Sequence, residues 1–311
     1  MASKLTSIAL CTYNGASYLR EQLDTLINQT YPNCEIVVVD DCSKDNTIEI
    51  LKQYATNYTQ IKLHVNTENL GYTKNFEKAI ALCTGEYIAL CDQDDIWDLQ
   101  KIELQVNGIE DNILIYHDSE FIHEDGTSMN KRMSDIMNLY RGDRPETFLF
   151  FNCVSGHSIL MKRELIDFAL PLKEGFFHDA WLAYVATNIS KIDFIPQCLV
   201  RYRQHDNSET NILNLSREKD NYKMSAIESF EKTKKWLAYC AQFKFNKEPS
   251  LIEGIYLAYK ERKNRYISLK LTAFFFKYWK TIFFTKKKSR ISKFNYIRKQ
   301  VWGLKVKEQV F

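Results

Sequence analysis

The sequence has 311 residues, 45% of them hydrophobic, 26% charged and 14% aromatic, with ten glycines and five prolines. This composition excludes collagen-like and low-complexity disordered chains, and the length suits one large domain with an appendage, or two domains. The net charge of +3 is unevenly spread: the residues from 260 onward hold sixteen Lys and Arg against two acids, which leaves a net charge of −11 before them. A basic end on an acidic body is typical of a chain that meets a polyanionic surface, a membrane or a nucleic acid.

The eight cysteines are scattered, and no two of them form a C-x-x-C pair. The sequence therefore predicts free thiols in a reducing cytosol and no zinc cluster. No run of eighteen residues is free of charge, so we expect no conventional membrane span. The first residues lead directly into an apolar run, so we expect no signal peptide.

The first part of the chain alternates between short apolar runs and segments in which apolar residues recur at helical spacing. The strand-like runs occupy residues 7–11, 35–39, 61–65, 86–91 and 113–116. Helices are expected between them, at residues 18–27, from about 47 and at 74–83. This alternation predicts an α/β fold, a Rossmann-like and mostly parallel central sheet flanked by helices. Ligands bind such sheets at the carboxyl ends of the strands, where this sequence places its polar clusters.

The sharpest of these clusters is Asp-Gln-Asp-Asp at residues 92–95, directly after a buried strand. Adjacent carboxylates repel one another unless a cation compensates, and oxygen ligands favour Mg²⁺ or Mn²⁺ over zinc. The sequence contains no G-x-G and no P-loop motif, so a metal is the expected holder of any phosphates. The alternative is an acidic, solvated turn or a helix N-cap.

A second polar cluster, at residues 40–45, follows the next expected strand, and residues 12–14 follow the first one. A carboxylate in this position can accept a hydrogen bond from a base N–H, and Tyr13 can pack on a ring. These features favour a nucleoside-binding site. The alternative is a capping box for the helix that begins near Thr47.

Together, residues 8–14, 29–31, 38–47, 69–71 and 85–97 resemble the family 2 glycosyltransferases of the GT-A fold, in their order and spacing, over about the first 210 residues. The resemblance implies contacts to the donor nucleotide from Thr12, Tyr13, Asn14, Asp41, Asp92 and Gln93. It also implies that Asp94 binds a divalent metal, Mn²⁺ or Mg²⁺, that bridges the diphosphate. Asp95 is an additional acid that is common in the family.

The segment at 176–182 resembles the part of the family that carries the catalytic base, which implies that role for Asp179. His178 stands where Glu is usual in the family. A lone acid among aromatic residues is partly desolvated, which raises its pKa toward the range that a general base needs. The alternative for Asp179 is an N-cap of a helix that begins at Ala180.

Two other segments extend the resemblance. The glycine-containing loop at 154–158 resembles the loop on the acceptor side, which implies an acceptor-facing position for Gly156, His157, His178 and Trp181. The segment at 201–205 resembles a downstream histidine motif, which implies that His205 reaches the metal or the diphosphate. The alternative for His205 is a surface position in a basic loop.

Beyond about residue 215 the pattern changes to long helical stretches rich in Lys, Tyr and Phe. We expect a GT-A catalytic domain at 1–215 and a helical, basic C-terminal region at 216–311. On a helix at 267–284, Lys270, Lys277 and Lys280 would face away from an apolar stripe, which is typical of a helix at an anionic membrane interface. The alternative is a helix that packs on the body through that stripe. Nucleic acid explains the basic region less well, because the catalytic half lacks a matching basic groove.

The resemblance thus implies a metal-dependent transferase that moves a sugar from a nucleotide-diphosphate donor to a glycan or lipid-linked acceptor. We expect it at the cytoplasmic face of a bacterial membrane, in surface polysaccharide synthesis. The motif wording is most similar to rhamnosyltransferases, so dTDP-rhamnose is the first expected donor and a UDP-hexose the second. No second nucleophile is apparent, which predicts inversion at the anomeric carbon.

A non-catalytic subunit that binds a sugar nucleotide or a glycan is the alternative from another class. His178 in the place of Glu favours it, whereas the intact Asp92, Asp94 and Asp179 favour the enzyme.

Overall fold

The computed structural model describes residues 3–205 and 226–303. They form two compact units, one built from residues up to 143 and from 153–205, the other from 144–152 and 226–303. The domain boundary predicted near residue 215 lies outside the described residues. Residues 144–152 belong to the second unit although they come from the middle of the first unit's sequence, which no sequence pattern indicated.

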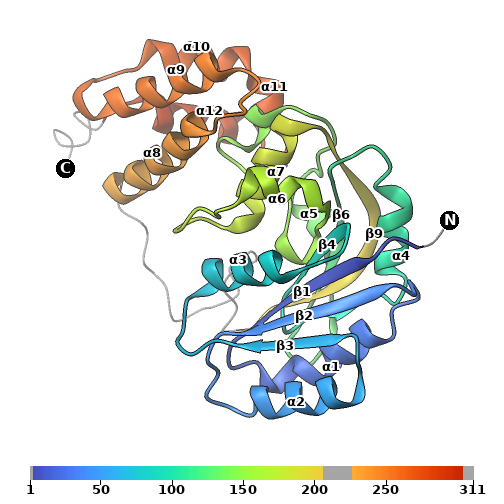
Figure 1. Cartoon of the computed structure of the whole chain (residues 1–311). Coiled ribbons are helices and arrows are strands. Elements are labelled where there is room, and N and C mark those ends of the chain that lie inside the picture. Colours follow the sequence, from blue (N-terminus) through green and yellow to red (C-terminus); the bar gives the residue numbers. More distant parts are fainter. Residues whose placement is uncertain (1–2, 206–225, 304–311) are drawn as a thin grey trace. The chain divides into compact units, whose positions relative to one another are not determined.

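Nine strands of the described residues form one mixed sheet (Figure 1). They are β1 (Thr6–Thr12), β2 (Cys34–Asp40), β3 (Ile61–Val65), β4 (Tyr87–Cys91), β5 (Ile96–Trp97), β6 (Leu114–Ile122), β7 (Ser128–Arg132), β8 (Leu160–Lys162) and β9 (Ile192–Arg203). The order is β3-β2-β1-β4-β8-β6-β9-β5, with β7 paired to β6. The first four strands are mutually parallel, while β8 runs antiparallel to both of its neighbours. The predicted α/β fold with flanking helices is confirmed. The sheet is parallel among its first four strands, but as a whole it is mixed, since four of its strand pairings are parallel and four are antiparallel.

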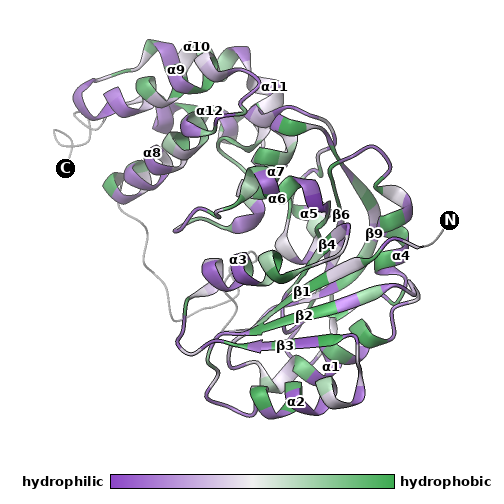
Figure 2. Ribbon diagram, viewed as in Figure 1, coloured by the Kyte–Doolittle hydropathy of each residue, from purple (hydrophilic) through white to green (hydrophobic). Residues whose placement is uncertain are grey.

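The helices of the first unit are α1 (Ala16–Ile27), α2 (Thr47–Asn57), α3 (Tyr72–Leu82), α4 (Lys101–Gly108), α5 (Met133–Ile136), α6 (Ile166–Ala169) and α7 (His178–Ile189), with short 3₁₀ turns η2 (Gly156–Ser158) and η3 (Arg163–Leu165). The three helices predicted between the first four strands are confirmed as α1, α2 and α3, and further helices follow in the first unit. Right-handed crossovers put α1 and α2 on one face of the parallel strands and α3 on the other, as Figure 1 shows. Because both faces are covered, β1 and β2 are almost continuously apolar and buried (Figure 2).

Strand β6 continues six residues past the end predicted at Tyr116. Its continuation begins with His117, Asp118 and Ser119, polar residues that are buried in the sheet and therefore interrupt the apolar pattern. Most of their polar atoms have partners: the Ser119 backbone N–H donates to the Asp118 carboxylate at 2.9 Å, although His117 Nε2 makes no hydrogen bond within the described residues. Buried polar groups with such partners cost little, so the strand persists where the sequence pattern ends.

The second unit is helical, as predicted. Its helices are α8 (Ala226–Gln242), α9 (Pro249–Lys260), α10 (Leu269–Lys277), α11 (Trp279–Ile282) and α12 (Arg290–Val301), with 3₁₀ turns η1 (Pro145–Phe148) and η4 (Glu261–Asn264). None of the helices within the described ranges is long and apolar enough to cross a membrane.

The single helix predicted at 267–284 is wrong, because α10 ends at Lys277 and α11 begins at Trp279. Its apolar stripe is partly used inside the unit: Leu271, Phe274 and Phe275 are buried. The Phe275 ring lies 4.9 Å from that of Phe150 in the 144–152 segment. These residues therefore pack inside the second unit, and the alternative of packing on the body stays a prediction.

Candidate active site

The carboxyl ends of β1 and β2 bring the first two polar clusters together. Thr12 is paired with Asp40 in the parallel register, and its hydroxyl donates to the Asp40 carboxylate at 2.8 Å. Two residues further, the Asn14 backbone N–H donates to Ser43 Oγ at 2.9 Å. Asp45 accepts from the Ala16 N–H at 3.1 Å and therefore ties the cluster to the start of α1. The polar clusters at 12–14 and 40–45 are thus in contact, as predicted. The Thr12 side chain itself is buried and bonds to Asp40.

The Gln93 side chain binds the backbone of Tyr13. Its Oε1 accepts from the Tyr13 N–H at 2.8 Å, and its Nε2 donates to the Tyr13 carbonyl at 3.0 Å. A Cβ on Gly15 would lie 2.1 Å from Gln93 Oε1, so only glycine leaves room for this contact. The acidic turn at 92–95 is therefore fixed against the loop after β1, and the Tyr13 ring stays 47% exposed.

Asp41 is buried and holds the loop that follows β3. Its carboxylate accepts the N–H groups of Leu70 and Gly71 at 2.8 and 2.9 Å, and the side-chain amide of Asn66 at 2.8 Å. Gly71 has φ +81°, a conformation that other residues rarely adopt. A base N–H would have to share the Asp41 oxygens with these donors.

Asp94 and His205 meet at the acidic turn: the His205 Nε2 lies 2.7 Å from the Asp94 Oδ2. The sequence motif had placed both near the same ion, and the structure brings them together although they are 111 residues apart in the sequence. Both side chains are largely buried, which strengthens their electrostatic interaction.

Asp95 is completely buried behind this pair. Its Oδ1 accepts the Arg203 backbone N–H at 3.0 Å, but its Oδ2 makes no hydrogen bond within the described residues. Burial, together with the charges of Asp94 and Asp92, raises the pKa of Asp95 well above its usual range. Arg203 lowers this pKa but does not outweigh the other effects, so a further positive charge would stabilise the ionised carboxylate.

A divalent cation fits this donor set. The ligand atoms of Asp92, Asp95 and His157 lie within 4.8 Å of one another, beside the Asp94–His205 pair. Carboxylate oxygens with one imidazole suit Mn²⁺ or Mg²⁺, and the orphaned Asp95 oxygen is the kind of atom that such an ion satisfies. His157 is the less available imidazole, because its Nε2 is already 2.8 Å from Ser119 Oγ.

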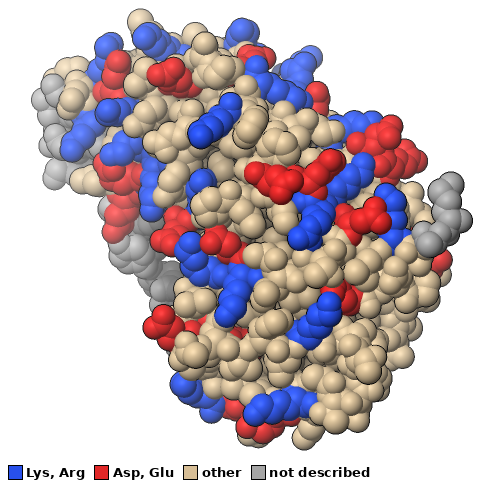
Figure 3. Space-filling view, in the orientation of Figure 1, with Lys and Arg blue, Asp and Glu red and all other residues tan. Residues whose placement is uncertain are grey.

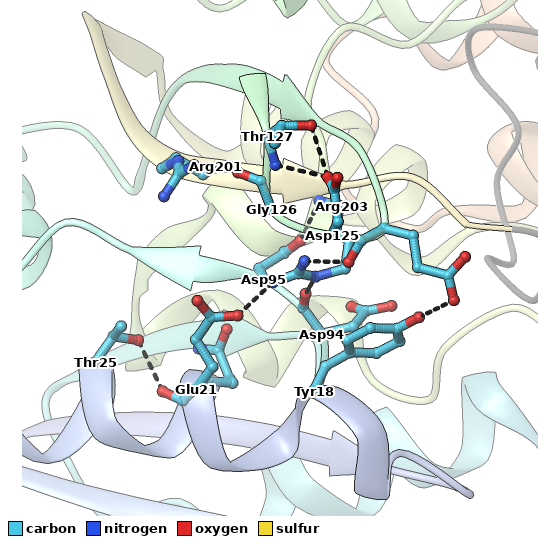
Figure 4. A network of polar contacts seen from close by, with 12 residues as sticks. Tyr18, Glu21, Thr25, Asp94, Asp95, Asp125, Gly126, Thr127, Arg201 and Arg203 are labelled. Atoms are coloured by element: carbon cyan, nitrogen blue, oxygen red, sulfur yellow. Dashed lines mark hydrogen bonds and ion pairs between the residues drawn. The ribbon is translucent and has the colours of Figure 1, made fainter. Parts of the chain in front are cut away.

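Arg203 organises the acidic turn, and sequence reasoning missed it although it lies in the same motif as His205. Its guanidinium donates to the Asp94 carbonyl at 2.8 Å and to the Glu21 carboxylate at 2.6 Å. It also stands 4.9 Å above the Tyr18 ring. Figure 4 shows this side chain between helix α1 and the acidic turn, so the arginine connects two elements that are distant in sequence.

We expect Arg203→Gln to lower the free energy of unfolding by about 2–4 kcal/mol, because it leaves buried carbonyls and Glu21 without their donor. Denaturant unfolding measures this change. Arg201→Gln is the matched control on the same strand; its side chain is exposed, so its cost should stay within about 0.5 kcal/mol. If both variants lost the same free energy of unfolding, the organising role of Arg203 would be contradicted.

Lys101 is a second residue that sequence reasoning missed. It is completely buried, and its ammonium stands 3.4 Å above the Trp97 ring with no hydrogen bond in the described part of the chain. Burial lowers the pKa of Lys101 to about 7, against the opposing pull of Cys91 and Asp95. A helix-spaced lysine in an otherwise ordinary amphipathic segment gives no sequence signal for such a position.

Asp179 lies in the first turn of α7, and the N-cap is Phe177, so Asp179 is not the N-cap that was the alternative. Burial raises the pKa of Asp179 to about 7, although the N–H groups of Ala180 and Gly156 hydrogen-bond its carboxylate and lower it. The carboxylates of Asp92 and Asp179 both act on Tyr72, whose pKa burial raises well above its usual value. Tyr72 therefore lies within electrostatic range of both acids.

The predicted acceptor-side residues divide into two groups. Gly156 and His178 contact one another next to Asp179. His157 and Trp181 are buried: His157 stacks at 4.2 Å on Tyr202, and the Trp181 indole N–H donates to the Ala169 carbonyl at 2.7 Å. In this structure these two side chains have packing partners on the inside of the unit.

Comparison with solved structures identifies the fold. S. aureus TarS 1–349, crystallised in complex with UDP-GlcNAc, aligns with 83% of this chain and 72% of its own, with a TM-score of 0.59 and 17% identity. The fold is therefore the GT-A fold of glycosyltransferases.

Sequence comparison identifies the family. The model of glycosyl transferase family 2 matches residues 7–168. An uncharacterized glycosyltransferase of Rickettsia typhi is 31% identical over 220 residues, 67% of each chain. The putative teichuronic acid biosynthesis glycosyltransferase TuaG of Bacillus subtilis is 30% identical over 129 residues, 41% of this chain and 51% of that one. The chain belongs to glycosyl transferase family 2 and is a transferase enzyme.

Proposed function

We propose that this family 2 glycosyltransferase moves a sugar, with inversion, from a nucleoside diphosphate donor to a hydroxyl of a glycan or lipid-linked glycan. The observation that carries the proposal is the pairing of two features: an acidic turn in which a buried oxygen of Asp95 has no hydrogen bond within the described residues, and an acid, Asp179, whose pKa lies near 7. The first suits a metal-bound diphosphate and the second suits a general base. Tyr72 lies within electrostatic range of both.

The donor would lie at the ends of β1, β2 and β4. The exposed Tyr13 ring can stack on the base, and Asn14, Asp41, Thr12, Asp92 and Gln93 shape or line the same edge. Asp94 and His205 would hold Mn²⁺ or Mg²⁺, with Asp92 and Asp95 adjacent. When bound, the ion would offset the negative charge of the departing diphosphate.

The transfer step is a single displacement. The Asp179 carboxylate takes the proton of the acceptor hydroxyl while that oxygen forms a bond to the sugar C1. The bond from C1 to the diphosphate oxygen breaks, and its electron pair leaves with the diphosphate. Attack on the face opposite the leaving group inverts the configuration. The raised pKa of Asp179 makes it a stronger base than an ordinary aspartate.

The proposed donor is dTDP-rhamnose, on the motif wording, with a UDP-hexose as the second candidate. TarS was solved with UDP-GlcNAc, and the name of TuaG refers to teichuronic acid biosynthesis, which supports a nucleotide sugar and a polysaccharide setting. A panel of nucleotide sugars, with and without Mn²⁺, tests the donor by thermal stabilisation and by release of free nucleotide. A donor should raise the Tm only with metal and should be turned over. Metal-dependent stabilisation without turnover of any donor would favour the binding-only alternative.

We further propose that the second unit attaches the enzyme to the inner face of the cell membrane. On α10 and α12, Leu269 and Ile291 are 77% and 75% exposed, and Phe276 and Phe294 are half-exposed beside them. Figure 3 shows many Lys and Arg side chains, with some acids, over the helices of this unit. Exposed apolar side chains among cations suit an anionic lipid surface.

The membrane proposal predicts that the full chain floats with phosphatidylglycerol vesicles and that Leu269→Asp/Ile291→Asp reduces this binding at least tenfold. Each side chain should contribute about 1 kcal/mol or more by leaving water. Leu99→Asp, at a 46% exposed position in the first unit, is the control and should bind as the wild type does. Undiminished flotation of the double variant would refute the proposal.

A further inference from the structure

His178 is a buried histidine without a hydrogen bond. Only 1% of it is exposed, and neither ring nitrogen has a partner in the residues that the structure describes. Its ring packs 4.3 Å from that of Phe76 and 5.1 Å from that of Tyr72, both on α3. Leaving a buried polar atom unbonded costs roughly 1–3 kcal/mol. Hydrogen bonding therefore does not explain why a histidine occupies this position. The packing of its ring is the remaining explanation.

The free edge of the ring meets Gly156. A Cβ on Gly156 would lie 2.7 Å from His178 Nε2 and 3.2 Å from Cε1. Gly156 does not have a positive φ, so its backbone conformation does not require glycine. The nearby His178 ring is what excludes a larger residue at position 156. His178 is therefore in close contact with the backbone of the η2 turn.

The same glycine contacts Asp179. The Gly156 N–H hydrogen-bonds the Asp179 carboxylate, so one residue links the His178 ring to the acid next to it in sequence. We propose that His178 is a positioning residue: wedged between α3 and the η2 turn, its ring holds Gly156 where the backbone N–H donates to Asp179. The importance of this role for catalysis rests on the proposed function, in which Asp179 is the base. The test of the role does not depend on that function.

The ring acts by packing and not by charge. Burial lowers the pKa of His178 to about 3, so the ring is neutral near pH 7. Tyr72 on α3 also flanks Asp179, and its raised pKa keeps it neutral too. Lys173, the cation in the loop before α7, stands 5.0 Å over the Trp181 ring. The Gly156 N–H is an uncharged donor, and its hydrogen bond favours the ionised form of Asp179.

The first test observes the hydrogen bond directly. Labelling with ¹⁵N-glycine gives signals from only ten residues, and an amide that donates to a carboxylate shifts as that carboxyl ionises. In the wild type the Gly156 amide should titrate with the pKa of Asp179, read from ¹³C-labelled carboxyl groups. His178→Ala should reduce this amide shift by at least half. An undiminished shift in His178→Ala, or no titration of the amide in the wild type, would overturn the proposal.

The second test is a double-mutant cycle on the pKa of Asp179. Gly156→Ala pushes the turn away from the ring and should raise that pKa by about 0.5–1 unit. In the His178→Ala background, where the methyl group has room, the same substitution should shift it by less than about a third as much. Equal shifts in the two backgrounds would overturn the proposal. Gly254→Ala, with open space around it, is the control and should leave the pKa unchanged.

These outcomes are distinct from a failure of the proposed function. The NMR titrations report on the hydrogen bond whether or not Asp179 is a base. If Asp179→Asn keeps full turnover, the assignment of the base fails; if the cycle shows no coupling, only the positioning role of His178 fails. With both correct, Gly156→Ala should also move the acidic limb of the kcat profile upward by the same 0.5–1 unit.

Discussion

Asp179→Asn should lower kcat by about 10²–10⁴-fold, because the acceptor hydroxyl loses the group that takes its proton. The change keeps the shape of the side chain and removes only its basicity. The dissociation constant of the donor in the presence of Mn²⁺ should change less than twofold, since the proposed donor site lies at the ends of β1, β2 and β4. Single-turnover transfer and calorimetric donor binding separate these two effects.

The raised pKa of Asp179 also predicts how kcat and the free energy of unfolding depend on pH. With the Asp179 pKa near 7, wild-type kcat should rise about tenfold per pH unit below pH 7 and level off above it, because only the ionised form accepts a proton. The raised pKa also means that the folded state holds its proton more tightly than the unfolded state. Asp179→Asn should therefore increase the free energy of unfolding at pH 8 but not at pH 4. A residual activity with an unchanged pH profile would contradict the assignment of the base.

Asp94→Asn should weaken Mn²⁺ binding in the presence of nucleoside diphosphate by on the order of 10²-fold or more, with a matching loss of turnover. The substitution removes a charged ligand, and it leaves the backbone carbonyl that accepts from Arg203 in place. Titration of Mn²⁺ by electron paramagnetic resonance measures the free ion directly and does not depend on turnover.

Asp98→Asn provides the matched control for Asp94. Asp98 is an exposed acid four residues along the same segment, and its carboxylate bonds only locally to the Gln100 N–H. It should bind Mn²⁺ as the wild type does. If the two variants lost affinity equally, the metal would respond to the general charge of the segment and not to Asp94.

The parts of the site that follow parallel strands were predictable from sequence. Short apolar runs end in polar clusters at 12–14, 40–45 and 92–95, and parallel strands bring their carboxyl ends to one edge. The contact between Asp94 and His205 was suggested by the motif and not by any pattern of hydropathy. Its distance of 2.7 Å comes only from the structure.

Other parts were not predictable because they depend on tertiary contacts. Arg203 and Lys101 are charged residues that a hydropathy pattern places at the surface, yet both are buried in the folded structure. Arg203 bonds to Glu21, which is far away in the sequence. The helix predicted at 267–284 was wrong because periodicity cannot show the break at Tyr278. The assignment of 144–152 to the second unit rests on packing such as Phe150 against Phe275, between residues that are far apart in the chain.

The most direct test of the account is the pulsed electron paramagnetic resonance spectrum of Mn²⁺ bound together with a nucleoside diphosphate. We predict ³¹P coupling from the diphosphate and ¹⁴N coupling from one imidazole, with the ¹⁴N signal lost in His205→Gln and kept in His157→Gln. A ¹⁴N signal that survives His205→Gln, or bound Mn²⁺ that shows no ³¹P coupling, would contradict the proposal that Asp94 and His205 hold the ion on the donor.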